Sequence, residues 1–153
     1  MKQVAIINKR RILYQRHDDV LNWASEFPGS NWLLLTIVAG KSKMILDDIA
    51  QKAIDRSVCY GCCVGLQGEL LHDFFDENIA ARTVGIENNF LPDFEIMTTW
   101  HDNVDDALWF SIFTAAHDTE HITTVVCLDA SVSEIESSLT ESIVKMQAGW
   151  IPD

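Results

Sequence analysis

The chain has 153 residues, of which 48% are hydrophobic and 22% are charged, with three prolines and seven glycines. This balance is typical of one compact globular domain and excludes disordered, collagen-like and coiled-coil proteins. The longest apolar stretches, residues 32–35 and 37–39, are far shorter than the roughly 20 residues of a membrane span, so we expect no membrane partner. The apolar segment after Lys2 is also too short for a secretory leader, and we expect a cytoplasmic protein.

The charge is distributed unevenly along the chain. Its net value is −12, but residues 1–56 carry nine basic and six acidic side chains, whereas residues 57–153 carry two basic and 17 acidic ones. A surface this negative repels phosphate backbones, so we expect no nucleic acid partner. It attracts basic proteins and accelerates their association at low salt. The alternative is that the acidic residues serve solubility alone.

The first 30 residues predict a short β segment and a helix. Residues 4–7 and 12–14 have the composition of two short strands about a polar turn. Residues 18–26 then predict a helix that ends before Pro28 and Gly29.

Four strand and helix pairs follow. Residues 32–39 form a nearly continuous apolar run, as expected of a strand buried on both faces of a parallel sheet. Residues 41–56 follow with apolar side chains at helical spacing and Ser42 as the candidate cap. The later strands are expected at residues 58–64, 94–100 and 122–128, each followed by an amphipathic segment.

Polar residues mark the starts of the last two helices. Asp102 or Asn103 is the candidate cap of one. Ser131 or Ser133, each three residues before a glutamate, forms a capping box for the other. The whole pattern predicts a single α/β domain over residues 1–153. We expect a three-layer α/β/α sandwich with a mainly parallel sheet of about four core strands plus the short N-terminal β segment.

Cys59 and Cys62 form a C-x-x-C motif beside Cys63. The motif falls within a predicted strand, where residues three apart point to opposite faces about 10 Å apart, so no disulfide is expected. A zinc site lacks a second pair of ligands. We interpret these thiols as buried structural groups, typical of a reducing compartment.

Two further groups have metal-like spacing. Glu69, His72 and Asp76 share one helix face, and His117 and His121 would meet if their segment were helical. Both groups equally describe a solvated surface or a loop. We therefore expect no metal site and no cofactor.

Trp100, His101 and Asp102 come at the end of the third core strand, and Asp129 at the end of the fourth. In open α/β sheets ligands bind outside the carboxyl ends of the strands, so these groups could line one pocket. One hypothesis is a small hydrolase-like enzyme with His101 as base, Asp129 as its orienting group and a cysteine nucleophile, either Cys62 or Cys63. The structural alternative places Trp100 in the core and uses Asp102 as a helix cap.

The residues Met-Thr-Thr-Trp-His at 97–101 and Ala-Leu-Trp-Phe at 107–110 resemble a segment of a family of small bacterial domains of unknown function. The resemblance covers roughly residues 58–128. It implies a bacterial origin, supports the order of strands and helices, and implies no activity.

The acidic surface favours a non-enzymatic domain that binds a basic protein, most concretely an immunity or inhibitor protein that covers the active cleft of a cationic toxin. The expected contact residues are acids near the carboxyl edge of the sheet with aromatic anchors: Glu69, Asp73, Asp76, Trp100, Asp102, Asp105, Asp106 and Trp109. The alternatives are the hydrolase-like enzyme and a subunit that self-associates, for example as a homodimer, through the helix that carries Trp109.

Overall fold

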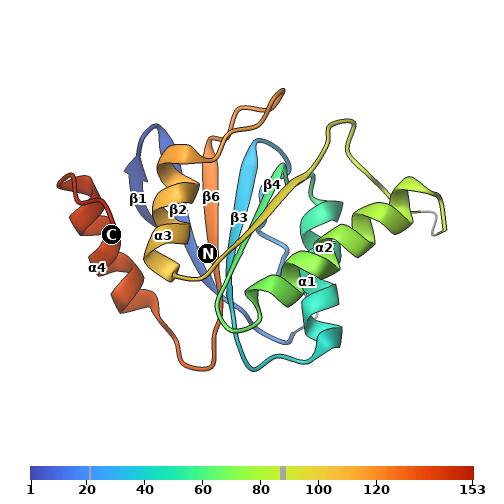
Figure 1. Ribbon diagram of the computed structural model, residues 1–153, viewed down its shortest axis with the longest axis horizontal. Helices are drawn as coiled ribbons and strands as arrows, with labels where there is room; N and C mark the ends of the chain where they lie inside the picture. Colours follow the sequence, from blue (N-terminus) through green and yellow to red (C-terminus); the bar gives the residue numbers. More distant parts are fainter. Residues whose placement is uncertain (21, 87–88) are drawn as a thin grey trace.

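The computed structural model describes residues 1–20, 22–86 and 89–153. Within them the chain forms a mixed α/β fold around one six-stranded sheet in the order β1-β2-β6-β3-β4-β5 (Figure 1). All neighbouring strands are parallel except β1 and β2. The strands are β1 (Lys2–Ile7), β2 (Arg10–Arg16), β3 (Trp32–Val38), β4 (Tyr60–Val64), β5 (Met97–His101) and β6 (Thr124–Ala130).

Four α-helices connect or follow the strands. They are α1 (Lys43–Asp55), α2 (Gly68–Thr83), α3 (Val104–Trp109) and α4 (Glu136–Gln147), and α3 continues directly into a π-helical segment, η1 (Phe110–Thr114). In Figure 1, α1 and α2 lie to the right of the sheet's centre and α3 and α4 to the left. None of the described helices is both long and apolar enough to cross a bilayer.

The sheet separates two clusters of buried side chains, as the apolar run of β3 leads us to expect. Leu33, Leu35 and Ile37 pack with residues of α3, η1 and α4. Trp32 and Leu34 alternate with them and pack with residues of α1 and α2. A side-chain period of two therefore lets one strand serve both clusters.

The N-terminal hairpin is confirmed, but its place in the sheet was not foreseen. Its second strand, β2, pairs in parallel with β6, so five strands rather than about four form the parallel part of the sheet. The helix expected at residues 18–26 is wrong over the described residues, and Leu21 lies outside them. Successive turns replace it, because the amide groups of Trp23, Ser25 and Phe27 each donate to the carbonyl three residues earlier.

Two of the expected helix caps are confirmed and one is wrong. The side chain of Ser42 accepts a hydrogen bond from the Ile45 amide, and Asn103 caps α3 through the Asp106 amide. The last helix has no side-chain cap and begins only at Glu136, several residues after the expected capping box. The hydroxyl of Ser131 donates to the buried carboxylate of Asp129 instead, so it is not free to cap a helix.

The turns after β3 and β4 interlock. Gly65 has a φ of 106°, and a Cβ there would lie 2.5 Å from the carbonyl oxygen of Val38, so this backbone approach requires glycine. The Gln67 amide donates to the same Val38 oxygen, and the Gln67 side chain both accepts from and donates to the backbone of Lys41. These contacts fix the start of α2, and with it Glu69, beside the end of β5.

Candidate functional site

The carboxyl ends of β4 and β5 enclose a hollow of about 450 Å³. Glu69 from the first turn of α2 lies on one side of it, and Trp100, His101 and Asp102 lie on the other. The sequence placed these groups near the carboxyl edge of the sheet, and the structure brings them together.

Two large apolar side chains are exposed at this hollow. Leu66 has 93% of its surface exposed and Trp100 has 44%, so the structural reading of Trp100 as a core residue is wrong. Trp100 lies outside the core because β5 is the edge strand of the sheet and has a neighbouring strand on one side only. An exposed tryptophan beside an exposed leucine is a feature of binding surfaces.

The acidic face of α2 extends from the hollow along β5. Thr98 donates to the carboxylate of Asp76 at 2.9 Å and lies 3.2 Å from the ring of His72, so α2 is fastened to the edge strand. Asp73 and Asp76 are exposed. We call this continuous region the β5-edge surface and define it by six residues: Leu66, Glu69, Asp73, Asp76, Trp100 and Asp102.

The acids of the β5-edge surface have no lysine or arginine partner among the described residues. The imidazole of His72, 3.6 Å from Asp73 and Asp76, neutralises them only when it is protonated. The ion pairs made by lysine, arginine and the amino terminus use other acids: Glu26, Asp48, Asp55, Asp129, Glu136 and Glu141. The surface thus combines uncompensated negative charge with an exposed aromatic side chain.

Three of the expected contact residues on α3 are not part of this surface. Asp105 turns toward α4, where it accepts a hydrogen bond from Ser142 at 2.6 Å. Trp109 lies against the ring of Phe113, with 5.3 Å between the ring centroids. Asp106 does not line the hollow, although it lies near enough to His101 to raise the pKa of that side chain.

His101 lines the hollow and also contacts Thr99 of β5 and Phe110 of η1. Its Nε2 lies 3.0 Å from the hydroxyl of Thr99, and its ring contacts Phe110. Burial lowers the pKa of His101, and the carboxylates of Asp106 and Asp102 partly oppose that shift. Thr99 and Ser111 also lie close enough to the Cys62 thiol to lower its pKa, although burial has the larger, opposite effect.

The thiols are buried and protonated. Burial raises the pKa of Cys62 to about 11 and that of Cys63 well above its ordinary value. Cys59 and Cys62 belong to the same apolar cluster, so the expectation of opposite faces is wrong. The strand begins only at Tyr60, and the alternation of side chains does not extend back to Cys59. All four cysteines are free thiols.

The structure does not bring Asp129 to His101. Asp129 is the second-last residue of β6, and the strands β3 and β4 lie between β6 and β5. At the usual spacing of neighbouring strands this separation is about 14 Å. The proposed grouping of His101, Asp129 and Cys62 or Cys63 is therefore not assembled in one place. Cys63 in addition faces the opposite cluster from Cys62.

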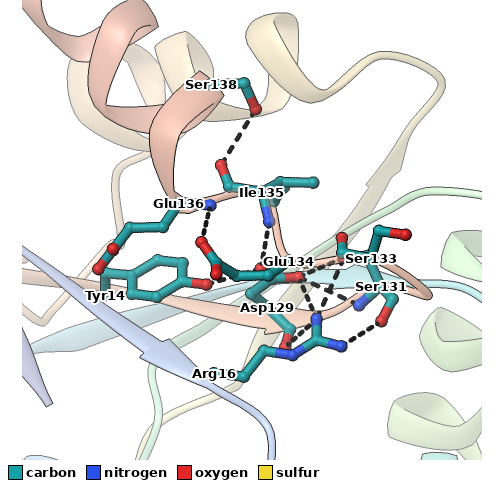
Figure 2. A network of polar contacts seen from close by, with 9 residues as sticks. All are labelled: Tyr14, Arg16, Asp129, Ser131, Ser133, Glu134, Ile135, Glu136 and Ser138. Atoms are coloured by element: carbon teal, nitrogen blue, oxygen red, sulfur yellow. Dashed lines mark hydrogen bonds and ion pairs between the residues drawn. The ribbon is translucent and has the colours of Figure 1, made fainter.

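Asp129 is instead the centre of a buried network that Figure 2 shows. Its carboxylate accepts hydrogen bonds from the Tyr14 hydroxyl at 2.7 Å and the Ile135 amide at 2.8 Å, and from the Ser131 amide and hydroxyl. Arg16 forms an ion pair with it at 2.9 Å. Burial alone would raise the pKa of Asp129, but the hydrogen bonds from Ser131, Ile135 and Tyr14 outweigh it and lower the pKa.

Tyr14 and Arg16 were missed as partners of Asp129 because they come from β2, more than 110 residues earlier in the chain. The only signal was an acid directly after the apolar run at residues 125–128, because a buried carboxylate must find donors. The network joins β2, β6 and the start of α4. Both carboxylate oxygens of Asp129 already accept hydrogen bonds from these elements, so neither is available to a substrate. We interpret it as structural.

The chain belongs to the family described as "Domain of unknown function (DUF7684)", whose model matches residues 10–146. This confirms the resemblance to a family of unknown function and extends it to the region from the first residue of β2 into α4. No curated protein and no solved structure matches the chain. The description of the family assigns no activity.

Proposed function

We propose that this chain is a non-enzymatic protein-binding domain that docks a basic protein on its β5-edge surface. One observation carries the proposal: Trp100 is exposed among acids that lack a lysine or arginine partner in the described parts of the chain. Unpaired surface charge is a cost to the isolated domain, because like charges repel, and a basic partner would remove that cost.

The two kinds of side chain have separate roles in this proposal. Trp100 and Leu66 provide apolar area that a partner buries, and a tryptophan at the centre of an interface is a frequent source of binding energy. The carboxylates of Glu69, Asp73 and Asp102 accelerate the encounter and select a positive partner. In the most concrete form of the proposal the partner is a cationic toxin and the domain covers its active cleft.

The alternative functions receive less support. A hydrolase-like mechanism would need Asp129 beside His101, and two strands separate them. It would also need a thiolate, whereas burial raises the pKa of both Cys62 and Cys63. The hypothesis of self-association through Trp109 has less support because Phe113 covers part of the Trp109 ring.

We further propose that the fold is a three-layer α/β/α sandwich, which the two apolar clusters on α1 with α2 and on α3 with α4 support. We also propose that the protein works in the cytoplasm, where its four free thiols would remain reduced.

The test is capture of a basic protein from a lysate of the source cells with matched charge variants. One variant, Glu69→Lys with Asp102→Lys, reverses charge on the β5-edge surface. The control, Glu134→Lys with Glu141→Lys, makes the same change in net charge at exposed positions beside and on α4. We expect the native chain and the control to retain the same basic protein at low salt, and the surface variant to lose it.

Trp100→Ala separates anchoring from charge. With the captured protein in hand, we expect this variant to dissociate at least about tenfold faster while its association rate changes little. Equal retention of the basic protein by all four chains, or capture of no basic protein at any salt concentration, would refute the proposal.

A further inference from the structure

A larger cavity, of about 670 Å³, lies at the opposite end of the sheet from the hollow beside Trp100. Its walls are the loops that precede the parallel strands: residues 29–30 before β3, Ser57 before β4, residues 90–95 before β5 and residues 117–120 before β6. The loops before β5 and β6 rise above the sheet at the top of Figure 1. We call this space the amino-end cavity.

The lining of the amino-end cavity is apolar and acidic. Phe90, Pro92 and Met97 supply apolar surface, and Phe90 and Met97 are exposed. Apart from His117, the titratable lining groups are carboxylates, namely those of Asp93, Glu95, Asp118 and Glu120. Because no lysine or arginine is among the described lining residues, the cavity attracts cations and repels anions.

The wall at residues 90–95 is fixed from two sides. The buried guanidinium of Arg82 donates to the carbonyl oxygen of Phe90 at 2.8 Å and pairs with Asp55 at 2.7 Å. Nε2 of His117 donates to the carbonyl oxygen of Glu95, and the His117 ring packs against Phe94 with 5.2 Å between centroids.

His117 also organises its own loop. Its Nδ1 accepts hydrogen bonds from the backbone amides of Thr119 and Glu120, each at 3.1 Å. The ring is therefore fully used in holding two walls together and is not free to bind a metal. Walls that are fixed before binding lose little conformational entropy when a ligand arrives.

We propose that the amino-end cavity binds a small organic cation, a protonated amine or guanidinium carried on an apolar body. The volume lies within the range of about 300–1,000 Å³ that small-molecule sites occupy. The cationic head would lie among the carboxylates of Asp93 and Asp118, and the apolar body against Phe90 and Pro92, where an aromatic face also attracts a cation. This inference does not rest on the proposed protein-binding function, because none of the six residues that define the β5-edge surface lines the cavity.

Tryptamine, which is a cation at neutral pH, and its uncharged alcohol counterpart tryptophol are the probes. Titration of each into the isotope-labelled full chain, followed by amide chemical shifts, reports both affinity and location. We expect tryptamine to shift the amides of residues 90–97 and 117–120 with saturation, and tryptophol to bind at least about threefold more weakly, as the loss of one partly exposed charge contact implies.

The variant Asp93→Asn with Asp118→Asn removes two exposed carboxylates from the cavity. It should lower the affinity for tryptamine by a similar factor. Glu134→Gln with Glu141→Gln makes the same change of charge at exposed positions away from the cavity and should leave the affinity unchanged. Phe90→Ala, at a half-exposed side chain, should weaken both probes. Equal binding of the two probes, shifts scattered over the other acidic surfaces, or equal affinity of all variants would overturn the proposal.

Discussion

Asp129 has no exposed surface, yet its pKa lies below the ordinary carboxyl value, so it is ionised inside the protein. Removing its charge would leave Arg16 without its partner and the Ile135 amide with a weaker acceptor. We expect Asp129→Asn to lower the free energy of unfolding by about 1–3 kcal/mol, because the amide group of asparagine leaves some of the buried donors that bond to Asp129 without an acceptor. Urea denaturation measures this loss. Asp73→Asn is the exposed control, and a similar loss in both variants would contradict the structural role of Asp129.

The same carboxylate makes stability depend on pH. Because the pKa of Asp129 is lower in the folded chain than in the unfolded one, its contribution is fully present above the unfolded value, and it disappears as the pH falls through the folded value. We expect the free energy of unfolding to fall below about pH 4, with a shallower fall in Asp129→Asn. Urea titrations at a series of pH values give both curves, and parallel curves would show that other groups cause the fall.

The pKa values of the buried cysteines are raised, whereas that of Asp129 is lowered. Burial raises the pKa of Cys62 to about 11 and of Cys127 to about 12. At pH 8 only about 0.1% of the Cys62 thiol would be thiolate, even before its lack of access is considered. We expect iodoacetamide to modify the native protein slowly and the urea-unfolded protein rapidly at all four cysteines, as measured by intact mass. Rapid modification of native Cys62 would instead revive the hydrolase-like hypothesis.

At the scale of elements, side chains of the N-terminal hairpin donate hydrogen bonds to carbonyl oxygens in and just after η1. Arg10 donates to the carbonyl oxygens of Ser111 and Ala115, and Asn8 donates to that of Ile112. We expect Arg10→Met to cost about 2–3 kcal/mol, because these hydrogen bonds come from a charged donor. Amide hydrogen exchange should accelerate at residues 110–115. Arg11→Met, which removes an exposed side chain whose Nε donates to Gln3, is the matched control and should change neither quantity.

The elements that the sequence predicts well are those with one dominant local signal. The strand at residues 32–39 and the helix capped by Ser42 follow from an apolar run and an amphipathic repeat. Residues 18–26 also carry a helical pattern, but Trp23 packs against His17 and Phe27 and donates its indole N–H to Asp48. Asp48 lies 25 residues further along the chain, and a contact of this kind overrides a local preference without appearing in any local pattern.

The candidate site was predictable in composition and not in geometry. Glu69, Trp100 and Asp102 could be placed near the carboxyl edge because strands end there. That β5 is an edge strand, which exposes Trp100, depends on the order of the strands. That Asp129 is remote from His101 depends on the same order, which one chain does not reveal. The amino-end cavity had no signal at all, because its walls come from four separate loops.

At the scale of the whole molecule, the excess of negative charge works against folding. Residues 57–153 carry 17 acids and two basic residues, and repulsion among them is relieved by salt, which screens charges beyond about 10 Å at 0.1 M. We expect the melting temperature to rise between low salt and 0.3 M sodium chloride, by roughly 2–4 °C for each kcal/mol of relieved repulsion. Differential scanning calorimetry measures the rise. A fall would mean that the ion pairs stabilise the fold more than the repulsion destabilises it.

The pairing of β2 with β6 has a consequence for synthesis on the ribosome. Residues 10–16 leave the exit tunnel early, but their parallel neighbour at residues 124–130 leaves it late. At about 5–20 residues per second the hairpin would wait on the order of ten seconds with Ile12 and Tyr14 uncovered. Nascent chains stalled before residue 124 has emerged should therefore be cleaved readily by protease within the hairpin. Chains stalled after α4 has emerged should resist cleavage there.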